Sequence, residues 1–330
     1  MKLSDIARLA GVSVTTASYV INGKAAQRRI SDATVARVRA VVEQHDFQPD
    51  PQAAGLRSGQ TRTLGFILPD LENPSYARLA KRLEQGARAR GYQLLIASSD
   101  DQPDTERQLL QLFRARRCDA LIVASCLPDG DDSYQRLLAG GLPVVGVDRA
   151  LDPQRFCSVI SDDQQASRQL TASLLHPAPR QIALLGARPE LNISQARNAG
   201  FRQALEGSDS ELLLEQGQSF SRDCGRQLME ALLERLGQPP AALVTTAYVL
   251  LEGVFDALKA RDLLHGPMAL GTFGDNLLLD FLPLPVNSMV QQHEAIAEQV
   301  LQLALGAVEN GDYQPGVQAV ARKFRQRRTE

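Results

Sequence analysis

Hydrogen-bonding and charged side chains follow apolar runs at three places in the larger part of this 330-residue chain. They are Asn73, Ser75 and Tyr76, then Asp148 and Arg149, and finally Asp275. If the runs are parallel strands, these side chains gather at the carboxyl ends of a sheet, where α/β folds bind ligands. Pro74 at the first position of a helix also leaves backbone N–H groups free for a ligand. The residue types favour a site for a phosphate or a hydroxyl-rich molecule.

Short motifs of catalysis and metal binding do not occur in the chain. It contains no HExxH, Walker phosphate loop, GxSxG elbow, GxGxxG fingerprint or CxxC pair, and its four histidines are scattered. We therefore expect reduced thiols, no metal, no cofactor and no enzymatic activity. No apolar run approaches the ~20 residues that cross a bilayer, and the N-terminus does not read as a signal peptide. These features favour a cytoplasmic protein without a membrane partner.

Apolar runs alternate with amphipathic helical stretches from residue 63 onward. Seven runs are predicted to be strands: Leu64–Leu68, Gln93–Ala97, Ala120–Ala124, Pro143–Val147, Ile182–Leu185, Ala242–Val244 and Met268–Thr272. Helices are expected between them, for example over Ser75–Arg90. Short buried strands that alternate with helices predict an α/β fold with doubly wound parallel sheets. Residues 63–330 exceed one such unit, so we predict two lobes.

The formal net charge of −2 hides an asymmetry between two parts of the chain. Residues 1–62 contain nine Lys and Arg against five Asp and Glu, whereas the other 268 residues contain 27 against 33. The near-neutral total therefore does not argue against nucleic acid as a partner. Attraction to phosphates is confined to the basic N-terminal part.

The first 45 residues have the spacing of a three-helix domain. Ser4 is expected to cap a first helix that Gly11 ends, Ser13 to cap a second helix, and Ser31 to begin a third. On the second helix, apolar residues face inward and the opposite face carries Thr15, Ser18, Tyr19 and Asn22. Two short helices around a glycine turn predict a helix-turn-helix. The spacing alone leaves open a three-helix bundle without a ligand.

The N-terminal segment closely resembles the DNA-binding domain of the LacI/GalR family of transcription regulators. The resemblance is carried by Leu3-Ser4-Asp5-Ile6-Ala7-Arg8-Leu9-Ala10-Gly11-Val12-Ser13, Thr16-Ala17-Ser18 and Val20-Ile21-Asn22-Gly23. It extends over the chain and implies that residues 63–330 form the two Rossmann-like lobes of the periplasmic-binding-protein fold. It also implies a homodimer on a pseudo-palindromic operator, whose half-sites lie about one helical turn, ~34 Å, apart.

By this resemblance the second helix enters the major groove of DNA. Val14 then meets a thymine methyl, and the hydroxyls of Thr15 and Tyr19 meet base edges or phosphates. Many relatives have arginine where Tyr19 stands, so this chain is expected to read a different half-site. Phosphate contacts, which position the domain without specifying sequence, are expected from Thr16, Ser18, Asn22, Ser31 and Thr34. Nearby Lys24, Arg28 and Arg29 are either further phosphate contacts or part of a solvated loop.

Residues 46–62 are predicted to be a linker that contains a short helix. Asp50-Pro51 marks its start, and a helix of about nine residues with Gly55 inside it is marginal in water. It should therefore fold only against a partner. It resembles the family's hinge helix, which implies that Leu56 wedges between base steps in the minor groove while Ala53 lets two hinge helices approach. A plain linker with Leu56 packed on the core is the alternative.

The resemblance also assigns effector contacts in the cleft between the lobes. Arg197 has the context of the family's effector arginine, Phe220 holds the place of a stacking ring, and Asp275 lies near the place of an acidic ligand. The expected effector site is Asn73, Ser75, Tyr76, Asp148, Arg149, Arg197, Phe220 and Asp275. Its two arginines and two acids suit an anionic sugar, because guanidinium groups bind phosphate and carboxylates accept sugar hydroxyls.

Two segments depart from the common family pattern. The Gly-Phe-Asp motif is here Gly271-Thr272-Phe273-Gly274-Asp275, and Ala247-Tyr248 replaces an Asn-Asp pair, so this wall should be more apolar or use Thr245 and Thr246. These departures resemble the branch of the family that responds to phosphorylated fructose. They imply fructose 1-phosphate, or else fructose 1,6-bisphosphate, as effector, and genes of fructose uptake and central carbon metabolism as targets.

Other interpretations stay open at this point. The effector of a LacI-type regulator can be another small sugar or a purine. A sugar-phosphate enzyme on the same lobes would use Asp148 or Asp275, and a transporter's sugar-binding protein would share the lobes but not the N-terminal motif. The last residues contain no leucine heptads, which favours a dimer over a tetramer.

Overall fold

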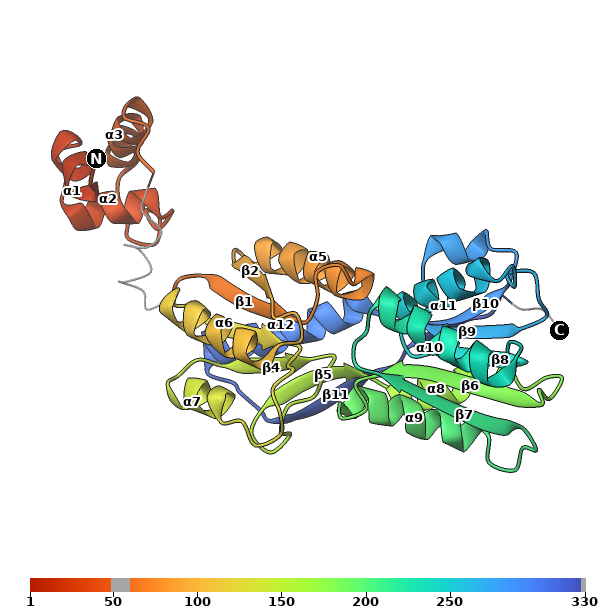
Figure 1. Ribbon diagram of the computed structural model, residues 1–330. Coiled ribbons are helices and arrows are strands. Elements are labelled where there is room, and N and C mark those ends of the chain that lie inside the picture. The colour runs from red at the N-terminus through yellow and green to blue at the C-terminus, as the bar shows by residue number, and fades with distance from the viewer. Residues whose placement is uncertain (49–59, 328–330) are drawn as a thin grey trace. The chain divides into compact units, whose positions relative to one another are not determined.

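The computed structural model describes residues 1–48 and 60–327, and the chain divides into two compact units, Met1–Arg62 and Thr63–Glu330 (Figure 1). The predicted hinge helix, with Ala53 and Leu56, lies outside the described residues. No helix in the described part of the chain is long and apolar enough to cross a membrane.

The N-terminal unit contains three helices, α1 (Leu3–Leu9), α2 (Val14–Ile21) and α3 (Asp32–Gln44). Its small core consists of Ile6, Ala7, Ala10, Ala17, Val20 and Val38. Gly11 has a φ of +64° and makes the left-handed turn that separates α1 from α2. The turn brings the two short helices together over one core, which confirms the predicted helix-turn-helix.

The predicted N-cap of α2 is confirmed, and the predicted N-cap of α1 is wrong. The Ser13 Oγ accepts a hydrogen bond from the Thr16 backbone N–H (3.1 Å), as expected of an N-cap. The expectation that Ser4 caps α1 is wrong, because the helix begins at Leu3. The Asp5 carboxylate accepts a hydrogen bond from the Lys2 backbone N–H (2.9 Å), and this contact moves the start of the helix ahead of Ser4.

The larger unit contains two six-stranded sheets, one in each of two lobes. In the first lobe the spatial order is β11-β5-β4-β3-β1-β2, with β1 (Thr63–Leu68), β2 (Gln93–Ser98), β3 (Ala120–Val123), β4 (Val144–Val147), β5 (Cys157–Ser161) and β11 (Gly316–Val320). In the second it is β12-β10-β9-β8-β6-β7, with β6 (Gln181–Ala187), β7 (Glu211–Gly217), β8 (Ala242–Thr245), β9 (Ala269–Phe273), β10 (Val286–Val290) and β12 (Lys323–Arg325). Neighbouring strands are parallel, except that β12 runs antiparallel to β10.

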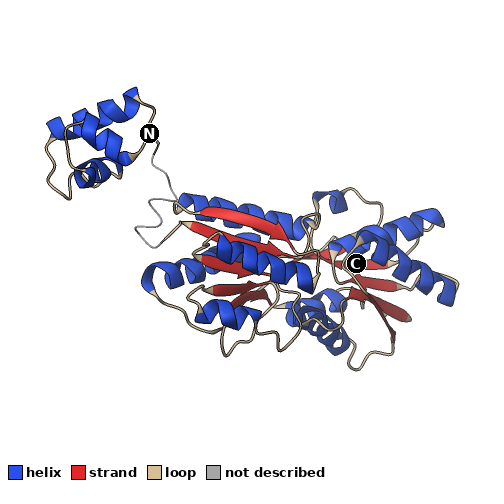
Figure 2. Ribbon diagram, turned by 60° about the vertical axis from the view of Figure 1, so that its left-hand side comes forward, coloured by secondary structure: helices blue, strands red, loops and turns tan. Residues whose placement is uncertain are grey.

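Helices cover both faces of each sheet (Figure 2). In the first lobe, α5 (Pro74–Ala89) and α12 (His293–Asn310) pack on one face, and α6 (Pro103–Ala115) and α7 (Ser133–Ala139) on the other. In the second lobe, α10 (Arg222–Leu236) and α11 (Tyr248–Ala260) cover one face, and α8 (Asp163–Ala172) and α9 (Asn192–Ala204) the other. The short 3-10 helix η1 (Leu277–Asp280) follows β9. These layers confirm the predicted two-lobed, doubly wound α/β fold.

The chain crosses between the lobes three times: from β5 to α8, from β10 to α12, and from β11 to β12. Each crossing places polar residues at the boundary of the lobes, among them Asp163, Gln291 and Arg322. Because these residues lie where the lobes join, a change in the arrangement of the lobes would move them relative to their partners.

All seven predicted strands are present, with ends that differ by one or two residues. The unpredicted strands are β5, β7, β10, β11 and β12. Of these, β7 and β11 lie at sheet edges and are half-buried or exposed, and β10 contains the buried polar residues Asn287 and Ser288. Continuous apolar runs identify strands that are buried on both faces by apolar neighbours, and they also identified the half-buried edge strand β2, whose residues 94–97 are all apolar.

Candidate functional site

A cleft between the two lobes is lined by all eight residues expected to contact an effector. They are Asn73, Ser75, Tyr76, Asp148, Arg149, Arg197, Phe220 and Asp275. The cleft also receives residues that sequence reasoning missed: Asp70, Arg78, Asp101, Gln291, His293 and Arg322. The cleft lies where loops follow the carboxyl ends of strands in both lobes, which is the usual ligand site of this architecture.

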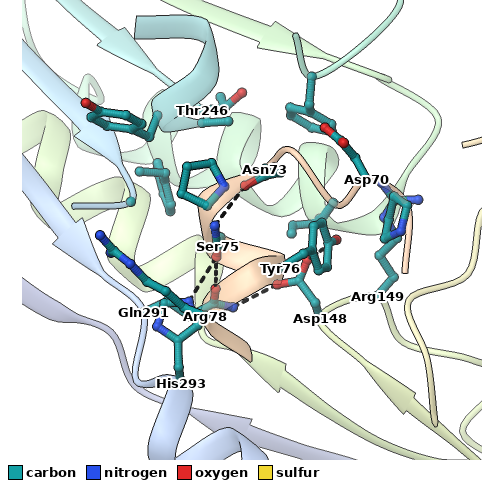
Figure 3. Close-up of a pocket in the computed structure, with 18 of the residues that line it drawn as sticks. Asp70, Asn73, Ser75, Tyr76, Arg78, Asp148, Arg149, Thr246, Gln291 and His293 are labelled. Atoms are coloured by element: carbon teal, nitrogen blue, oxygen red, sulfur yellow. Dashed lines mark hydrogen bonds between the residues drawn. The ribbon is translucent and has the colours of Figure 1, made fainter. Parts of the chain in front are cut away.

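The start of α5 forms one wall of the cleft (Figure 3). The Asn73 Oδ1 accepts a hydrogen bond from the Ser75 backbone N–H (3.0 Å), and Pro74 occupies the first helical position. The Ser75 Oγ donates to Gln291 Oε1 (2.6 Å) and lies 3.0 Å from His293 Nε2. Gln291 and His293 flank the crossing from β10 to α12. The helix terminus is therefore tied to the boundary between the lobes.

His293 is neutral near pH 7. Burial, together with the positive charges of Arg78 and Arg322, lowers the pKa of its imidazole to about 4. The ring therefore acts as a neutral hydrogen-bonding group at the cleft and adds no positive charge to it.

Asp148 is ionised and held by two neutral donors. The Tyr76 hydroxyl donates to Oδ2 (2.7 Å) and the Gln291 Nε2 donates to Oδ1 (2.8 Å). Burial opposes ionisation, but the guanidinium groups of Arg197 and Arg322 keep the pKa of Asp148 below its ordinary value. The carboxylate retains lone pairs that sugar hydroxyls can use.

Arg149 is buried and its two terminal nitrogens are held as a fork. The Nη1 atom donates to Asp101 Oδ1 (2.5 Å) and to the Ser125 backbone carbonyl (3.2 Å), and Nη2 donates to Asp101 Oδ2 (3.2 Å). Burial opposes protonation, but the negative charge of Asp101 raises the pKa of Arg149 above its ordinary value. The Nε atom is buried and has no hydrogen-bond partner among the described residues. A permanent cation with an unused donor thus lines the cleft.

Two further buried arginine side chains, Arg197 and Arg322, lie close together where the chain crosses between the lobes. The Nε atoms of Arg197 and Arg322 both donate to Asp163 Oδ1, at 3.1 Å and 2.9 Å. Both guanidinium groups also lie against the ring of Phe273, 4.5 Å and 5.2 Å from its centroid. The Arg197 Nη1 donates to the Thr246 carbonyl (2.7 Å). The two guanidinium groups share the Asp163 carboxylate and also lie near the Asp148 carboxylate, so the cleft offers charged hydrogen-bond donors to an anionic ligand without a net excess of positive charge.

Asp275 lines the cleft, but its carboxylate is already engaged. It accepts hydrogen bonds from Ser288 Oγ (2.7 Å), Arg327 Nη2 (2.7 Å) and Arg325 Nη1 (3.1 Å). Burial opposes ionisation, but these donors keep the pKa of Asp275 low. Its backbone carbonyl accepts a hydrogen bond from Arg78 Nη1 (2.7 Å), on the other lobe. Asp275 thus joins the C-terminal segment and both lobes, in addition to any contact with a ligand.

The wall formed by the second lobe is partly apolar. Phe220 packs against Ala187, Cys224 and Leu250, and Ala247 and Tyr248 line the cleft next to Thr246. The Thr246 hydroxyl is buried and has no partner among the described residues. Two buried donors, this hydroxyl and the Arg149 Nε, are thus left for a bound molecule.

A second set of predicted residues lies on the N-terminal unit. The Val14 side chain is exposed (43%) at the start of α2, and Thr15 is exposed beside it. The Arg28 guanidinium lies over the Tyr19 ring, 4.9 Å from its centroid. An exposed apolar residue next to hydroxyl and cationic groups is suited to reading the edges of bases.

The predicted phosphate contacts on this unit are partly engaged with one another. The hydroxyls of Ser13 and Thr16 lie 2.8 Å apart, and those of Ser31 and Thr34 lie 3.0 Å apart. The Asn22 Nδ2 donates to the Ser18 carbonyl (2.8 Å) and Oγ (3.3 Å). When these side chains contact phosphates, they must give up or share the hydrogen bonds that they make on this unit.

Comparisons with known proteins cover both units. Bacterial regulatory proteins of the lacI family match residues 2–50, and periplasmic binding proteins and sugar binding domain of the LacI family match residues 61–308. The fructose operon regulatory protein of Vibrio cholerae is 48% identical over 99% of this chain and 100% of its own length. The catabolite repressor/activator of Escherichia coli is 46% identical over 99% of this chain and 98% of its own.

A solved structure is also similar. It is the Cra transcriptional dual regulator from Pseudomonas putida in complex with fructose 1-phosphate, which is 68% identical with a TM-score of 0.80. The match covers 81% of this chain and 99% of that one.

Proposed function

Because the chain belongs to the LacI family of bacterial regulatory proteins, as its N-terminal motif predicts, we propose that it is a transcription regulator with a sugar-phosphate effector. The effector is fructose 1-phosphate, with fructose 1,6-bisphosphate as the second candidate, and the targets are genes of fructose and central carbon metabolism. The relatives that support this assignment are the fructose and catabolite regulators and the 68% identical regulator that was solved with fructose 1-phosphate.

One observation carries the effector assignment: the side chains of Arg149, Arg197 and Arg322 are buried in one cleft around Asp148. The three guanidinium groups supply charge-assisted donors to a phosphate, and Asp148 accepts hydroxyls of the sugar. Asn73, Ser75 and Tyr76 contribute at the helix terminus, and Phe220 and Thr246 close the opposite wall. Asp275 acts mainly by holding the lobes and the C-terminal segment together.

DNA binding belongs to the first 62 residues. Residues 1–45 place Val14, Thr15 and Tyr19 in the major groove, while Thr16, Ser18, Asn22 and Ser31 contact phosphates. Residues 46–62 form the hinge with Ala53 and Leu56, and residues 63–330 bind the effector and form the homodimer. A twofold dimer matches a pseudo-palindromic operator in the cytoplasm, at the nucleoid.

Regulation follows from the position of the cleft. Because the site contains residues of both lobes and of their crossings, a bound effector changes the arrangement of the lobes, separates the two hinges and weakens operator binding. Linkage requires that operator DNA weaken effector binding by the same factor.

Acid–base chemistry in the cleft is disfavoured by the charges of its residues. A general acid or base is most effective when its pKa lies near the working pH. The pKa of Asp148 is held below its ordinary value and that of His293 is about 4, so neither group shuttles protons well at pH 7. We therefore favour a regulator over a sugar-phosphate enzyme on the same lobes.

Isothermal titration of the full-length protein tests the effector assignment. The panel contains fructose 1-phosphate, fructose 1,6-bisphosphate, fructose 6-phosphate, fructose and a purine base. Binding of fructose 1-phosphate tighter than all others supports the proposal. Tighter binding of fructose or the purine would refute a phosphate-directed site.

A further inference from the structure

The first lobe contains a buried carboxyl group that does not line the cleft. Glu106 lies in the first turn of α6, is 0% exposed, and has no ion-pair partner among the described residues. A buried carboxyl group without a counter-ion is costly unless hydrogen-bond donors surround it. Its donors therefore indicate which part of the fold depends on it.

Three donors from two other segments reach this carboxyl group. The Ser125 Oγ donates to Oε1 (2.7 Å), and the Cys126 backbone N–H donates to Oε2 (2.8 Å). The Tyr134 hydroxyl, on α7, donates to Oε1 and lies 3.0 Å from the Ser125 Oγ. The Ser125 Oγ also accepts a hydrogen bond from the Leu127 N–H (3.0 Å). Glu106 thus fixes the loop that follows β3 against α6 and α7.

This loop is one of two that hold Arg149. The Ser125 carbonyl accepts a hydrogen bond from Arg149 Nη1, and the Asp101 carboxylate binds both terminal nitrogens. Asp101 has a φ of +53° in the turn after β2, and the buried Ser99 in the same turn donates to the Leu68 carbonyl (3.3 Å). The side chain of an arginine has several rotatable bonds, so these acceptors decide where its unused Nε lies.

We propose that Glu106 is a positioning residue for effector binding. It holds the loop of Ser125 so that the carbonyl of this residue, together with Asp101, orients Arg149 in the cleft. The inference rests on the proposed function, because it takes Arg149 as an effector ligand. Glu106 itself touches no effector and acts through Ser125.

The test compares two amide substitutions on the same helix. Glu106→Gln keeps the size of the side chain but turns one acceptor into a donor, so at least one of its three donors loses its partner. We expect the dissociation constant of fructose 1-phosphate to rise about tenfold in isothermal titration. Asp104→Asn is the matched control, since this exposed acid pairs only with Arg107 among the interactions of the described residues and should leave the constant unchanged.

A double-mutant cycle separates positioning from general loosening of the lobe. In an Arg149→Lys background, Glu106→Gln should weaken binding by less than about threefold, because the fork that it orients is absent. In an Arg197→Lys background the effect should stay near tenfold. Tyr134→Phe, which removes one hydroxyl, provides a milder variant in case Glu106→Gln does not fold, and should weaken binding in the same direction.

The outcomes are distinguishable. If the unaltered protein binds fructose 1-phosphate and both Glu106→Gln and Tyr134→Phe bind it equally well, the positioning role is refuted while the proposed function stands. Equal losses in the Arg149→Lys and Arg197→Lys backgrounds would also refute it, since they indicate only a loosened lobe. If the unaltered protein binds no phosphorylated fructose, the proposed function fails and the inference fails with it.

Discussion

Replacing Arg197 by alanine removes a cleft arginine whose ion-pair partner, Asp163, keeps a second arginine. Its Nε shares Asp163 with Arg322, which stays 2.9 Å from the carboxylate, so the substitution leaves no unpaired buried charge. The Thr246 carbonyl loses one donor and the Phe273 ring loses one cation, which together cost about 1–3 kcal/mol of unfolding free energy. We expect the variant to fold and to bind operator.

The Arg197→Ala substitution should weaken effector binding by more free energy than it removes from folding. Two charge-assisted hydrogen bonds to a phosphate contribute about 1.5 kcal/mol each, so their loss of about 3 kcal/mol raises the dissociation constant roughly a hundredfold or more. Arg197→Lys keeps the charge without the planar guanidinium group, so its dissociation constant for fructose 1-phosphate should lie between those of the unaltered protein and Arg197→Ala. Arg202→Ala, an exposed arginine on the same helix, is the matched control and should bind as the unaltered protein does.

The assay is isothermal titration with fructose 1-phosphate, followed by fluorescence anisotropy on labelled operator. An unchanged dissociation constant in Arg197→Ala would refute the role of this arginine as an effector ligand. Loss of the operator complex, with a cooperative unfolding transition still present, would show that Arg197 supports DNA binding instead.

Three further predictions concern other parts of the chain. Leu56→Ala should lose sequence-specific operator affinity but keep salt-sensitive nonspecific binding, whereas equal loss of both in a salt titration would contradict the wedge. Thr246→Val should leave thermal stability unchanged or slightly higher, because the hydroxyl has no partner, yet weaken fructose 1-phosphate about fivefold; unchanged titration would show that the hydroxyl meets no effector. Because burial and nearby arginines lower the pKa of His293 to about 4, against about 6.5 when unfolded, the unfolded chain binds more protons between these values and stability rises with pH across that window. Urea unfolding of His293→Gln at pH 4.5 and pH 7 should show a smaller rise than the unaltered protein, and an equal rise would contradict this.

The fold was predictable where local pattern determines it. Strands such as Ala120–Val123 are buried on both faces and give unbroken apolar runs, and the turn at Gly11 separates two periodic helices. The edge strand Gly316–Val320 has no such run, because its stability comes from pairing with β5. Its register depends on residues about 160 positions away, which no local pattern records.

The residues of the candidate site were likewise predictable only where a local pattern marks them. Asp148 and Arg149 were predictable because they directly follow a buried strand. Gln291 follows a strand whose buried Asn287 and Ser288 obscured it, and Arg322 lies in a crossing between β11 and β12. A prediction of β10 and β11 would have placed both residues after strands and drawn attention to them. Nothing in the sequence near Asp101 indicates that its carboxylate binds Arg149, since that pair forms only when the sheet brings the carboxyl ends of β2 and β4 to the same edge.

The most direct measurement is the affinity of full-length protein for an operator duplex as fructose 1-phosphate is added. Saturating fructose 1-phosphate should weaken the operator complex by about 5- to 150-fold, the usual range of coupling between two sites, and unphosphorylated fructose should have no effect. An operator affinity that no phosphorylated fructose changes would show that this cleft does not control DNA binding.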